Sequence, residues 1–382
     1  MKFVVSSSDL LKVCQIAYGS IGTNSFNPLM EDFLFDLKDN KLTVSATNGD
    51  TNIVSTIHVE AEENAKLTLN AKILIETLKA LPTQPITLEF VEEQRSVEIT
   101  SAYGKYRVAC NDPALFPKMP KPQGVERIRV KGDFILRAIN YTIFATSNDE
   151  VRPAMMGVLF EIQKNCINFV ATDAHKLVKY TVFEKDGEAE GRFILSKKSV
   201  ALVKNAIDAN SNISVGFNAS FVFFESENTV VACRLMDATY PDYSVVIPQN
   251  NPNILVINRL DFLNSLKRIF IYSNKSTYQA ILNIVEDSMS IAGQDNDFSN
   301  EAAEQLACQF NGEPMIMGFN SKFLIEMLGV MDTEEVKFEL GLPNRAGLLF
   351  PGEQGSGEHL LMLVMPVMIP QPEVSTAEEG DE

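Results

Sequence analysis

The chain has 382 residues, 45% of them hydrophobic and 22% charged, which allows two or three domains of an ordinary globular protein. Its longest apolar run, residues 360–369, contains a proline and is far too short for a membrane-spanning helix. The formal net charge is −17, so the surface as a whole is acidic. Taken alone, this argues against nucleic acid as a partner, because phosphate binding requires lysine and arginine.

The five cysteines are dispersed along the chain and include no Cys-x-x-Cys pair. This pattern favours reduced thiols and argues against a disulfide framework or a zinc site. The N-terminal sequence MKFVVSSSDLLK lacks the apolar core and the small-residue cleavage site of a signal peptide. We therefore expect a cytoplasmic protein that does not associate with a membrane.

Helix-like and strand-like segments alternate along the chain. Apolar residues recur at helical spacing in six segments: 9–20, 69–82, 133–147, 195–208, 261–274 and 319–332. Alternating or compact apolar runs predict strands at 32–37, 41–47, 86–91, 96–102, 166–172 and 212–218. Hairpin turns are predicted at 38–41, 92–94 and 286–288. This order is typical of an α+β fold with mainly antiparallel sheets.

One unit of roughly 125 residues recurs along the chain. The segments 69–82, 195–208 and 319–332 each carry a lysine at their fourth residue and begin 126 and 124 residues apart. The sequence VSATNGD at 44–50 also corresponds to FVATDAH at 169–175. These matches predict three structurally similar domains, of which the third is the most divergent.

Two segments have the composition of linkers between these domains. Residues 120–124 and 248–253 are rich in proline, glycine and asparagine. We therefore place the domains at residues 1–121, 122–249 and 250–369. The remaining residues, 370–382, carry five carboxylates and no basic group, which predicts a disordered acidic tail.

The segment ATDAHKLVKY (171–180) raises the question of catalysis, because Thr172, Asp173 and His175 lie within four residues. Successive side chains on a strand point to opposite faces, so these groups do not readily converge on one reacting atom. His58 and His359 have no acidic or cysteine neighbours at metal-ligand spacing. No nucleotide-binding, serine hydrolase or zinc peptidase motif occurs. We predict a turn instead of an active site, and neither a metal nor a cofactor.

Basic residues are concentrated on the six helical segments. These segments carry ten basic and seven acidic residues, whereas the whole chain has 33 basic and 50 acidic residues. Two interpretations stay open: ordinary solvated helix faces, or a surface shared by all three domains that faces a polyanion. The basic residues are Lys12, Lys72, Lys79, Arg137, Lys197, Lys198, Lys204, Lys267, Arg268 and Lys322.

Domain size limits how such a surface could surround DNA. A domain of roughly 125 residues has a radius of gyration of about 14 Å, which corresponds to a sphere about 36 Å across. Three such spheres in a ring leave a hole of only about 6 Å, whereas six leave about 36 Å, enough for a duplex. A ring around DNA would therefore be a head-to-tail dimer closed by two equivalent interfaces.

Several segments, spread over all three units, carry a resemblance to a known family. They are the opening MKF with LLK, VRPAMMGVLFE (151–161), ATDAHKLV (171–178), YPDYSVVIP (240–248), GFNSKFL (318–324) and LVMPVMI (363–369). In order and spacing, the chain resembles the beta sliding clamp family, the processivity subunit of bacterial DNA polymerase III, over residues 1–369. The resemblance implies a DNA clamp fold in which three α+β domains form half of a six-domain ring. It also implies a homodimer that encircles duplex DNA without reading its sequence and that has no catalytic activity.

The resemblance also implies three sets of site residues. An apolar pocket between the second and third domains would bind partner peptides through Arg152, Met155, Thr172, His175, Leu177, Pro241, Val246, Phe323, Leu363, Met365, Pro366 and Val367. The DNA-facing residues would be Lys12, Asn24, Lys72, Lys197 and Lys198, and the dimer interface would include Tyr106, Ile271 and Tyr272. The expected partners are the replicative and other DNA polymerases, the clamp-loader complex and repair proteins with clamp-binding peptides.

The chain departs from the family pattern at several of these positions. Ala174 and Lys176 stand where the family usually has glycine and arginine. Val245 replaces a basic residue, and Phe323 replaces a tyrosine. Asn24 stands where an arginine is usual. These changes leave peptide binding as the expectation but put the ranking of partner affinities and the Asn24 contact with DNA in doubt.

Two other functions remain as alternatives to the clamp. An α+β enzyme would use carboxylates such as Asp173 and Asp242, but it would have to explain three copies of one unit without a shared catalytic group. A monomeric repeat scaffold that binds only proteins would show neither dimerisation nor retention on circular DNA.

Overall fold

The computed structural model describes residues 2–22 and 28–369. Contacts between Cα atoms divide the chain into two compact units. We name Met1–Phe169 with Val182–Tyr240 the first unit, and Val170–Thr181 with Pro241–Glu382 the second unit. Each is described by itself. The predicted tail at 370–382 and the predicted DNA contact Asn24 lie outside the described residues.

The first repeat folds entirely within the first unit. Its elements are β1 (Lys2–Ser6), α1 (Ser7–Tyr18), η1 (Pro28–Glu31), β2 (Asp32–Lys38), β3 (Lys41–Thr47), β4 (Thr51–His58), β5 (Glu60–Ala61), β6 (Ala65–Asn70), α2 (Ala71–Ala80), β7 (Pro85–Val91), η2 (Glu92–Gln94), β8 (Ser96–Thr100), β9 (Lys105–Asn111) and η3 (Pro113–Leu115). The predicted hairpin turns at 38–41 and 92–94 connect β2 to β3 and β7 to β8.

The second repeat contributes most of its elements to the first unit. They are β10 (Glu126–Lys131), α3 (Gly132–Thr142), η4 (Ile143–Ala145), η5 (Pro153–Met156), β11 (Gly157–Ile162), β12 (Ile167–Thr172), β13 (Lys176–Val182), β14 (Gly191–Ser196), α4 (Lys197–Ala206), β15 (Asn212–Phe217), β16 (Phe221–Glu225) and β17 (Thr229–Arg234). The turn between β12 and β13, together with most of β13, belongs to the second unit. The helix expected over 133–147 ends at Thr142 and continues as the 3-10 turn η4.

The remaining elements lie in the second unit. They are η6 (Tyr243–Val246), β18 (Asn253–Asn258), α5 (Arg259–Tyr272), β19 (Gln279–Val285), β20 (Ser288–Asp295), β21 (Asn300–Ala307), β22 (Gln309–Asn311), β23 (Met315–Asn320), α6 (Ser321–Val330), β24 (Glu335–Leu340), β25 (Gly347–Pro351), β26 (Glu358–Val364) and β27 (Pro366–Val367). The predicted turn at 286–288 connects β19 to β20.

Antiparallel sheets form the framework of each unit. In the first unit, thirteen strands follow the order β10-β15-β16-β17-β4-β3-β2-β6-β9-β8-β7-β1-β5. The two repeats meet where β17 pairs with β4, with Thr229 opposite Ser55 and Cys233 opposite Thr51. In the second unit, one sheet has the order β21-β20-β19-β23-β27, and β13-β26-β25-β24-β18-β22 are neighbours in another. The predicted α+β fold with mainly antiparallel sheets is thus confirmed.

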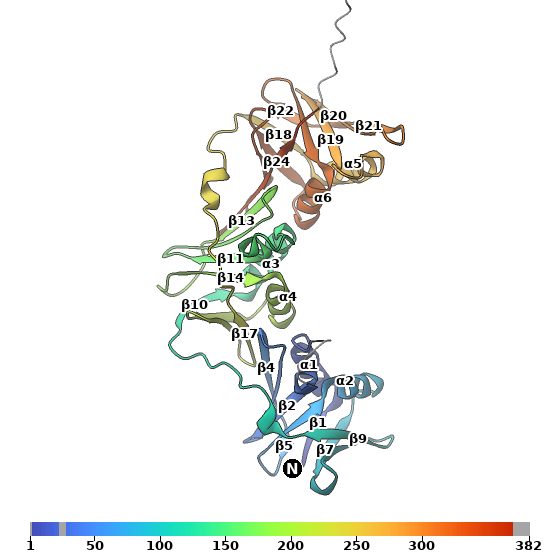
Figure 1. The fold of residues 1–382 in the computed structure, drawn as a ribbon, viewed down its shortest axis with the longest axis vertical. Helices are drawn as coiled ribbons and strands as arrows, with labels where there is room; N and C mark the ends of the chain where they lie inside the picture. Colours follow the sequence, from blue (N-terminus) through green and yellow to red (C-terminus); the bar gives the residue numbers. More distant parts are fainter. Residues whose placement is uncertain (1, 23–27, 370–382) are drawn as a thin grey trace, which may run out of the picture. The chain divides into compact units, whose positions relative to one another are not determined.

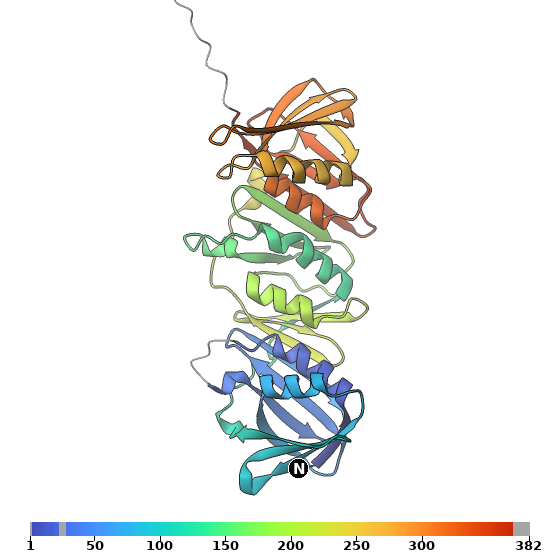
Figure 2. The same cartoon turned by 90° about the vertical axis from the view of Figure 1, so that its right-hand side faces the viewer.

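Helices cover one face of the sheets in the first unit. Figure 1 labels α1 to α4, and Figure 2 shows α1 and α2 in blue and α3 and α4 in green on the face turned to the viewer. On α1 the buried residues Leu10, Val13, Cys14 and Ala17 recur at helical spacing. This apolar stripe faces the sheet and leaves the other side of the helix, with Lys12, exposed.

The repeated helix start has a local physical cause. The residue before each of α2, α4 and α6 is an N-cap whose side-chain oxygen accepts a backbone N–H: Asn70 from Ile73 at 3.1 Å, Ser196 from Ser199 at 3.1 Å and Asn320 from Lys322 at 3.0 Å. Such a cap satisfies one of the four backbone donors that a helix start leaves without an intrahelical partner. The sequence repeat therefore preserves a capping residue immediately before each helix.

Candidate functional site

The segment from Thr172 to Lys176 forms the tight turn between β12 and β13. The Asp173 carboxylate Oδ1 accepts the backbone N–H groups of His175 and Lys176, each at 2.9 Å. Thr172 Oγ1 donates to the Lys176 carbonyl at 2.7 Å and accepts the Ala174 N–H at 3.1 Å. Thr172 and Asp173 thus bind the backbone of their own turn, and neither is arranged to activate a nucleophile. The predicted turn is thus confirmed.

Ala174 occupies the tip of this turn in a left-handed backbone conformation. Its φ is 77°, a region in which the Cβ atom of an L-residue is crowded by the backbone. Glycine has no Cβ atom and adopts this conformation freely. The resemblance places glycine here, and the backbone explains why.

Lys176 is the last residue of the turn and the first of β13, and its charged side chain is buried. The side chain is 6% exposed, and Nζ lies 2.9 Å from Asp173 Oδ2 and 3.1 Å from Glu326 Oε2 on α6. Nζ also lies 4.2 Å from the centre of the Phe323 ring. A buried ammonium group is costly unless it is paired, so the two carboxylates are what keep this charge inside the protein. The sequence did not predict this cluster, because Glu326 is far away along the chain.

The same turn contacts the C-terminal strands of the second unit. The backbone N–H of Met365 donates to the His175 carbonyl at 2.9 Å. The His175 and Phe323 rings are stacked, with their centroids 6.3 Å apart and their planes at 22°. Pro366 pairs with Phe319 where β27 joins β23. In Figure 1, β13 lies beside α6, so residues distant in sequence meet at this point.

Apolar side chains around the turn divide into a buried group and an exposed group. Leu177 and Leu363 are buried, as is Thr172. Val246 is 52% exposed and Met365 39%, and the remaining predicted peptide contacts in this unit are exposed or half-buried: Pro241, His175, Phe323, Pro366 and Val367. Exposed apolar groups beside a buried apolar base are what an extended peptide with leucine or phenylalanine anchors requires.

Two predicted peptide contacts, Arg152 and Met155, belong to the first unit. Arg152 is exposed, with its Nε 3.8 Å from Asp149 Oδ2. The Met155 carbonyl accepts the Ser147 N–H at 2.8 Å, which anchors η5. Their part in the peptide site stays a prediction.

The predicted DNA-facing lysines lie on the helices of the first unit. Lys72 is the second residue of α2, and Lys197 and Lys198 are the first two residues of α4. Lys12, Lys72 and Lys198 are exposed, and Lys197 is half-buried. A cation in the first turn of a helix is unfavourable, because the N-terminus already carries partial positive charge. Lys72, Lys197 and Lys198 therefore stand where a bound anion would offset this cost, whereas Lys12 lies in the middle of α1.

The predicted dimer contacts lie on elements at sheet edges. Tyr106 is a half-buried residue of β9. Ile271 and Tyr272 end α5 and are 63% and 43% exposed. Helix α5 packs against β20 and β21, and β21 is the edge strand of its sheet.

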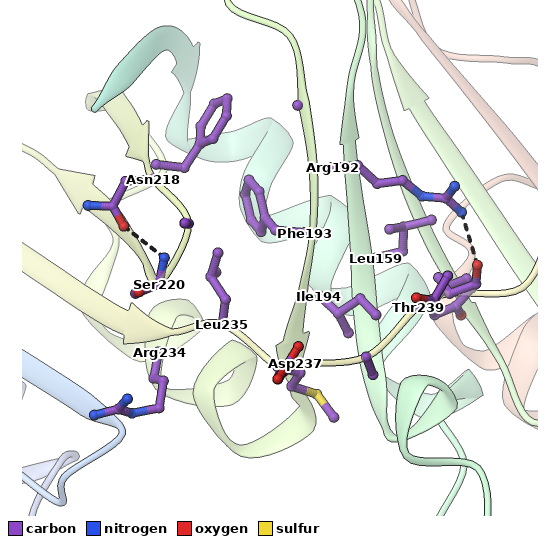
Figure 3. Close-up of a pocket in the computed structure, with 16 residues that line it drawn as sticks. Leu159, Arg192, Phe193, Ile194, Asn218, Ser220, Arg234, Leu235, Asp237 and Thr239 are labelled. Carbon is purple, nitrogen blue, oxygen red and sulfur yellow. Dashed lines mark hydrogen bonds between the residues drawn. The ribbon is translucent and has the colours of Figure 1, made fainter. Parts of the chain in front are cut away.

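A cavity that the sequence did not predict opens in the first unit (Figure 3). It has a volume of about 770 Å³. Phe193 and Ile194 of β14 and Leu235 after β17 provide apolar walls. The Arg192 and Arg234 guanidinium groups already lie 3.9 Å from Glu161 and 3.6 Å from Asp50. Each of these two guanidinium groups therefore already has a carboxylate neighbour.

The described chain shows neither a metal-ion cluster nor a membrane-spanning helix. Within residues 2–22 and 28–369, no three His, Cys, Asp or Glu side chains are grouped to hold a metal ion. No helix of the same part is long and apolar enough to cross a membrane. None of the five cysteines, all of which lie in the described chain, forms a disulfide. Burial raises the pKa of both Cys110 and Cys233 to about 12, so these two thiols stay protonated at neutral pH.

Comparison with known proteins gives consistent matches along the chain. Family models match for the N-terminal domain of the DNA polymerase III beta subunit over residues 1–120, its central domain over 129–242 and its C-terminal domain over 244–366. The beta sliding clamp of Vibrio cholerae is 24% identical over 371 residues, covering 97% of this chain and 100% of the relative. That of Haemophilus influenzae is 25% identical over 367 residues, covering 95% and 99%.

Solved structures share the fold. The DNA polymerase beta subunit of Streptococcus pyogenes superimposes with a TM-score of 0.91 at 22% identity, covering 97% of this chain and 100% of that chain. A sliding clamp of Pseudomonas aeruginosa bound to griselimycin gives a TM-score of 0.90 at 22% identity, with the same coverage.

Proposed function

This chain belongs to the DNA polymerase III beta subunit family, the beta sliding clamps, and we propose that two copies close head to tail into a ring around duplex DNA. The family and the fold of three similar domains, predicted from the sequence, are confirmed. The protein is thus a sliding clamp and not an enzyme. The alternative of an enzyme that uses Asp173 and Asp242 is rejected. Both carboxylates instead accept backbone N–H groups, Asp173 within its turn and Asp242 from Ser244 at 3.0 Å.

In this proposal the ring acts in the cytoplasm as the processivity factor that tethers the replicative polymerase. The three domains comprise residues 1–121, 122–249 and 250–369, which places each repeat in one domain. Each protomer would then supply three of the six domains that the size estimate requires for a duplex-sized hole.

The observation that carries DNA binding is the repeated helix start with its lysine. Lys72, Lys198 and Lys322 are each the second residue of a capped helix, and none of these helices has an acidic residue in its first turn. Backbone N–H groups, partial positive charge and an ammonium group therefore coincide three times in one chain. Such contacts bind phosphates without reading bases, which suits a clamp that slides.

Two sheet edges support closure into a dimer. Residues Lys105–Ala109 of β9 pair with β8 on one side, and in the described part of the chain β6 covers the other side only from Cys110 onward. In the second unit, β21 is the edge strand of its sheet and pairs with β20 on one side. Within the described chain, no strand pairs with its other side. Exposed edges are templates for pairing with another chain.

The strands at these two edges carry side chains of opposite charge, of which Lys105 and Arg107 also pair with Glu98, and Glu304 with Arg268. Lys105 and Arg107 lie on β9, whereas Glu301 and Glu304 lie on β21. The β9 edge of each protomer would meet the β21 edge of the other protomer, so a dimer would contain two equivalent contacts. Tyr106, Ile271 and Tyr272 would add apolar area beside the paired strands.

We assign the peptide site to the surroundings of the Thr172–Leu177 turn. The second unit brings His175, Phe323 and Met365 together there, beside the buried Leu177 and Leu363. Partners would be DNA polymerases, the clamp loader and repair proteins, each through an extended peptide with apolar anchors. Exposed Met365 suits several partners, because methionine is flexible and polarisable.

Retention on DNA tests the ring directly. The purified protein is loaded by a clamp loader onto nicked circular duplex and onto the same DNA after linearisation, and both are then washed at raised salt. We expect retention on circles and loss from linear ends, because a closed ring can leave only at an end. Equal loss from both DNAs would refute the ring, since salt dissolves ionic binding irrespective of DNA topology.

A further inference from the structure

We infer that Lys176 is a positioning residue for partner peptides and that, with Asp173 and Glu326, it fixes the Phe323 and His175 rings. The inference rests on the proposed peptide site and deepens it. It adds two residues, Lys176 and Glu326, that need not touch a peptide at all.

The first step is that Lys176 links two separate elements of the second unit. Asp173 belongs to the turn after β12, and Glu326 belongs to α6. One ammonium group lies 2.9 Å from the Asp173 carboxylate and 3.1 Å from the Glu326 carboxylate. Because the Lys176 side chain is only 6% exposed, water does little to screen these interactions. The turn therefore has a defined place against α6.

The second step concerns the Phe323 ring. Nζ of Lys176 lies 4.2 Å from the ring centre, close enough for a cation–π interaction. The His175 imidazole stacks with the same ring, with centroids 6.3 Å apart. Phe323 is half-buried and His175 is exposed, so both rings offer surface to a ligand while Lys176 stays beneath. The buried Lys176 side chain thus sets the position of the half-buried Phe323 ring and the exposed His175 ring.

The third step is what removal of the charge would do. Without the ammonium group, the Asp173 and Glu326 carboxylates, whose side chains are 16% and 30% exposed, would face each other and repel. Asp173 also holds the backbone N–H groups of His175 and Lys176, so movement of its carboxylate would move the whole turn. Binding surfaces lose affinity when their supporting groups no longer fix them, even if the contacting residues are unchanged.

The chain contains a matched control for this arrangement. Lys337 Nζ lies 2.9 Å from Glu339 Oε1 and 4.9 Å from the centre of the Phe350 ring, also in the second unit. Like Lys176, it pairs with a carboxylate and lies near a phenylalanine ring, but it has one carboxylate partner where Lys176 has two, and its side chain is 38% exposed. It lies on β24, and neither partner is a predicted peptide contact. Lys337→Met therefore measures the effect of losing such a cluster elsewhere in the same unit.

The test uses the full-length protein and a dye-labelled synthetic peptide with leucine and phenylalanine anchors. Binding is measured by fluorescence anisotropy for the parent protein and for Lys176→Met, Glu326→Gln, Lys176→Arg, Lys337→Met and Phe323→Ala. Thermal unfolding of each variant shows that it is folded at the assay temperature. Glu326→Gln retains the pair with Asp173 and keeps the test valid if Lys176→Met does not fold.

We expect Lys176→Met and Glu326→Gln to weaken binding about tenfold. Lys176→Arg, which keeps the charge, should remain close to the parent, and Lys337→Met should have no effect. A second readout is the His175 imidazole proton signal without peptide, which is assignable because the chain has three histidines. It should shift in Lys176→Met and Glu326→Gln but not in Lys337→Met.

The outcomes separate this inference from the proposed peptide site. If Phe323→Ala also binds as the parent does, the peptide site itself is wrong, and the inference falls with it. If Phe323→Ala weakens binding while Lys176→Met and Glu326→Gln do not, the site stands and the positioning role is refuted. A loss of affinity shared by Lys337→Met, without a shift of the His175 signal, would show a general loss of stability and also refute it.

Discussion

At single positions of this clamp, a residue adopts a backbone conformation that is unfavourable for its side chain. Ala174 is one of six non-glycine residues with positive φ in the described chain. It is held there by the turn, since Thr172 and Asp173 bind the backbone on either side of it. The hydrogen bonds of the turn thus offset a local conformational cost.

Relief of that cost is a first prediction. Ala174→Gly should raise the free energy of unfolding by about 1 kcal/mol, because glycine adopts a φ of 77° without a Cβ clash. The gain is reduced by the larger backbone entropy of glycine in the unfolded chain. Urea denaturation measures it. Ala201→Gly, inside α4, is the control and should instead lose about 1 kcal/mol. If Ala174→Gly lowered the free energy of unfolding, it would contradict the claim that the backbone is strained at Ala174.

His359 gives a second prediction at this scale, on pH. Burial lowers the pKa of its imidazole below 6.5, and the Lys179 and Lys337 charges lower it further. The unfolded chain therefore binds a proton more readily, so stability falls as pH drops below about 6.5. Between pH 7.5 and 5, His359→Gln should show a shallower decline in the free energy of unfolding than the parent. Exposed His58→Gln is the control, and an unchanged slope in His359→Gln would contradict the assignment.

In the proposed clamp, whole helices contribute to the affinity for DNA, and α2 shows how this requirement would conflict with stability. It has a lysine in its first turn, Lys72, and another in its last turn, Lys79. The helix dipole disfavours the first and favours the second. A helix selected for stability alone would not place a cation at its N-terminus.

Charge reversal at the two ends of α2 should therefore have opposite effects on stability. Lys72→Glu should stabilise the protein by about 0.3–1 kcal/mol, and Lys79→Glu should destabilise it by a similar amount. Lys72→Glu should nevertheless weaken DNA binding and reduce the slope of log affinity against log salt by about 1. Urea unfolding and salt titration on duplex DNA measure the two effects. If Lys72→Glu bound DNA as the parent does, the N-terminal end of α2 would not be a DNA contact.

At the scale of the whole molecule, the proposed function requires two copies to close into one ring. The uncovered edges of β9 and β21 belong to different units, and each protomer carries one of each. Closure thus needs no residue that is buried within the protomer. Mutations that open the ring should leave the protomer folded.

Ile271→Glu tests whether the ring can open while the protomer stays folded. Ile271 is 63% exposed, so a carboxylate there should not disturb the core, but it would be buried without a partner in the proposed dimer. We expect monomers in sedimentation equilibrium, an unchanged unfolding transition of the protomer, and loss of retention on circular DNA. Leu342→Glu, at a residue 62% exposed in the same unit, is the control and should stay dimeric. A dimeric Ile271→Glu protein would place the interface elsewhere.

Local interactions explain which features could be predicted from the sequence. The N-caps Asn70, Ser196 and Asn320 act on backbone groups within three residues of themselves, so a repeated helix start is visible in a repeated sequence. The turn at 38–41 likewise depends on Asp39 and Asn40, two residue types that tolerate positive φ. The family resemblance then supplied candidate site residues that no local pattern identifies.

By itself, the sequence determined the three repeats, the α+β composition and the basic character of the helices, because periodicity and charge are properties of neighbouring residues. Only the tertiary structure decided the environment of Lys176, which in the sequence reads as an ordinary charged residue. Its partners Glu326 and Phe323 lie on α6, and the Met365 N–H that holds the turn comes from the end of the described chain. Burial and pairing of a charge depend on which distant segments pack against it, and no local pattern records that.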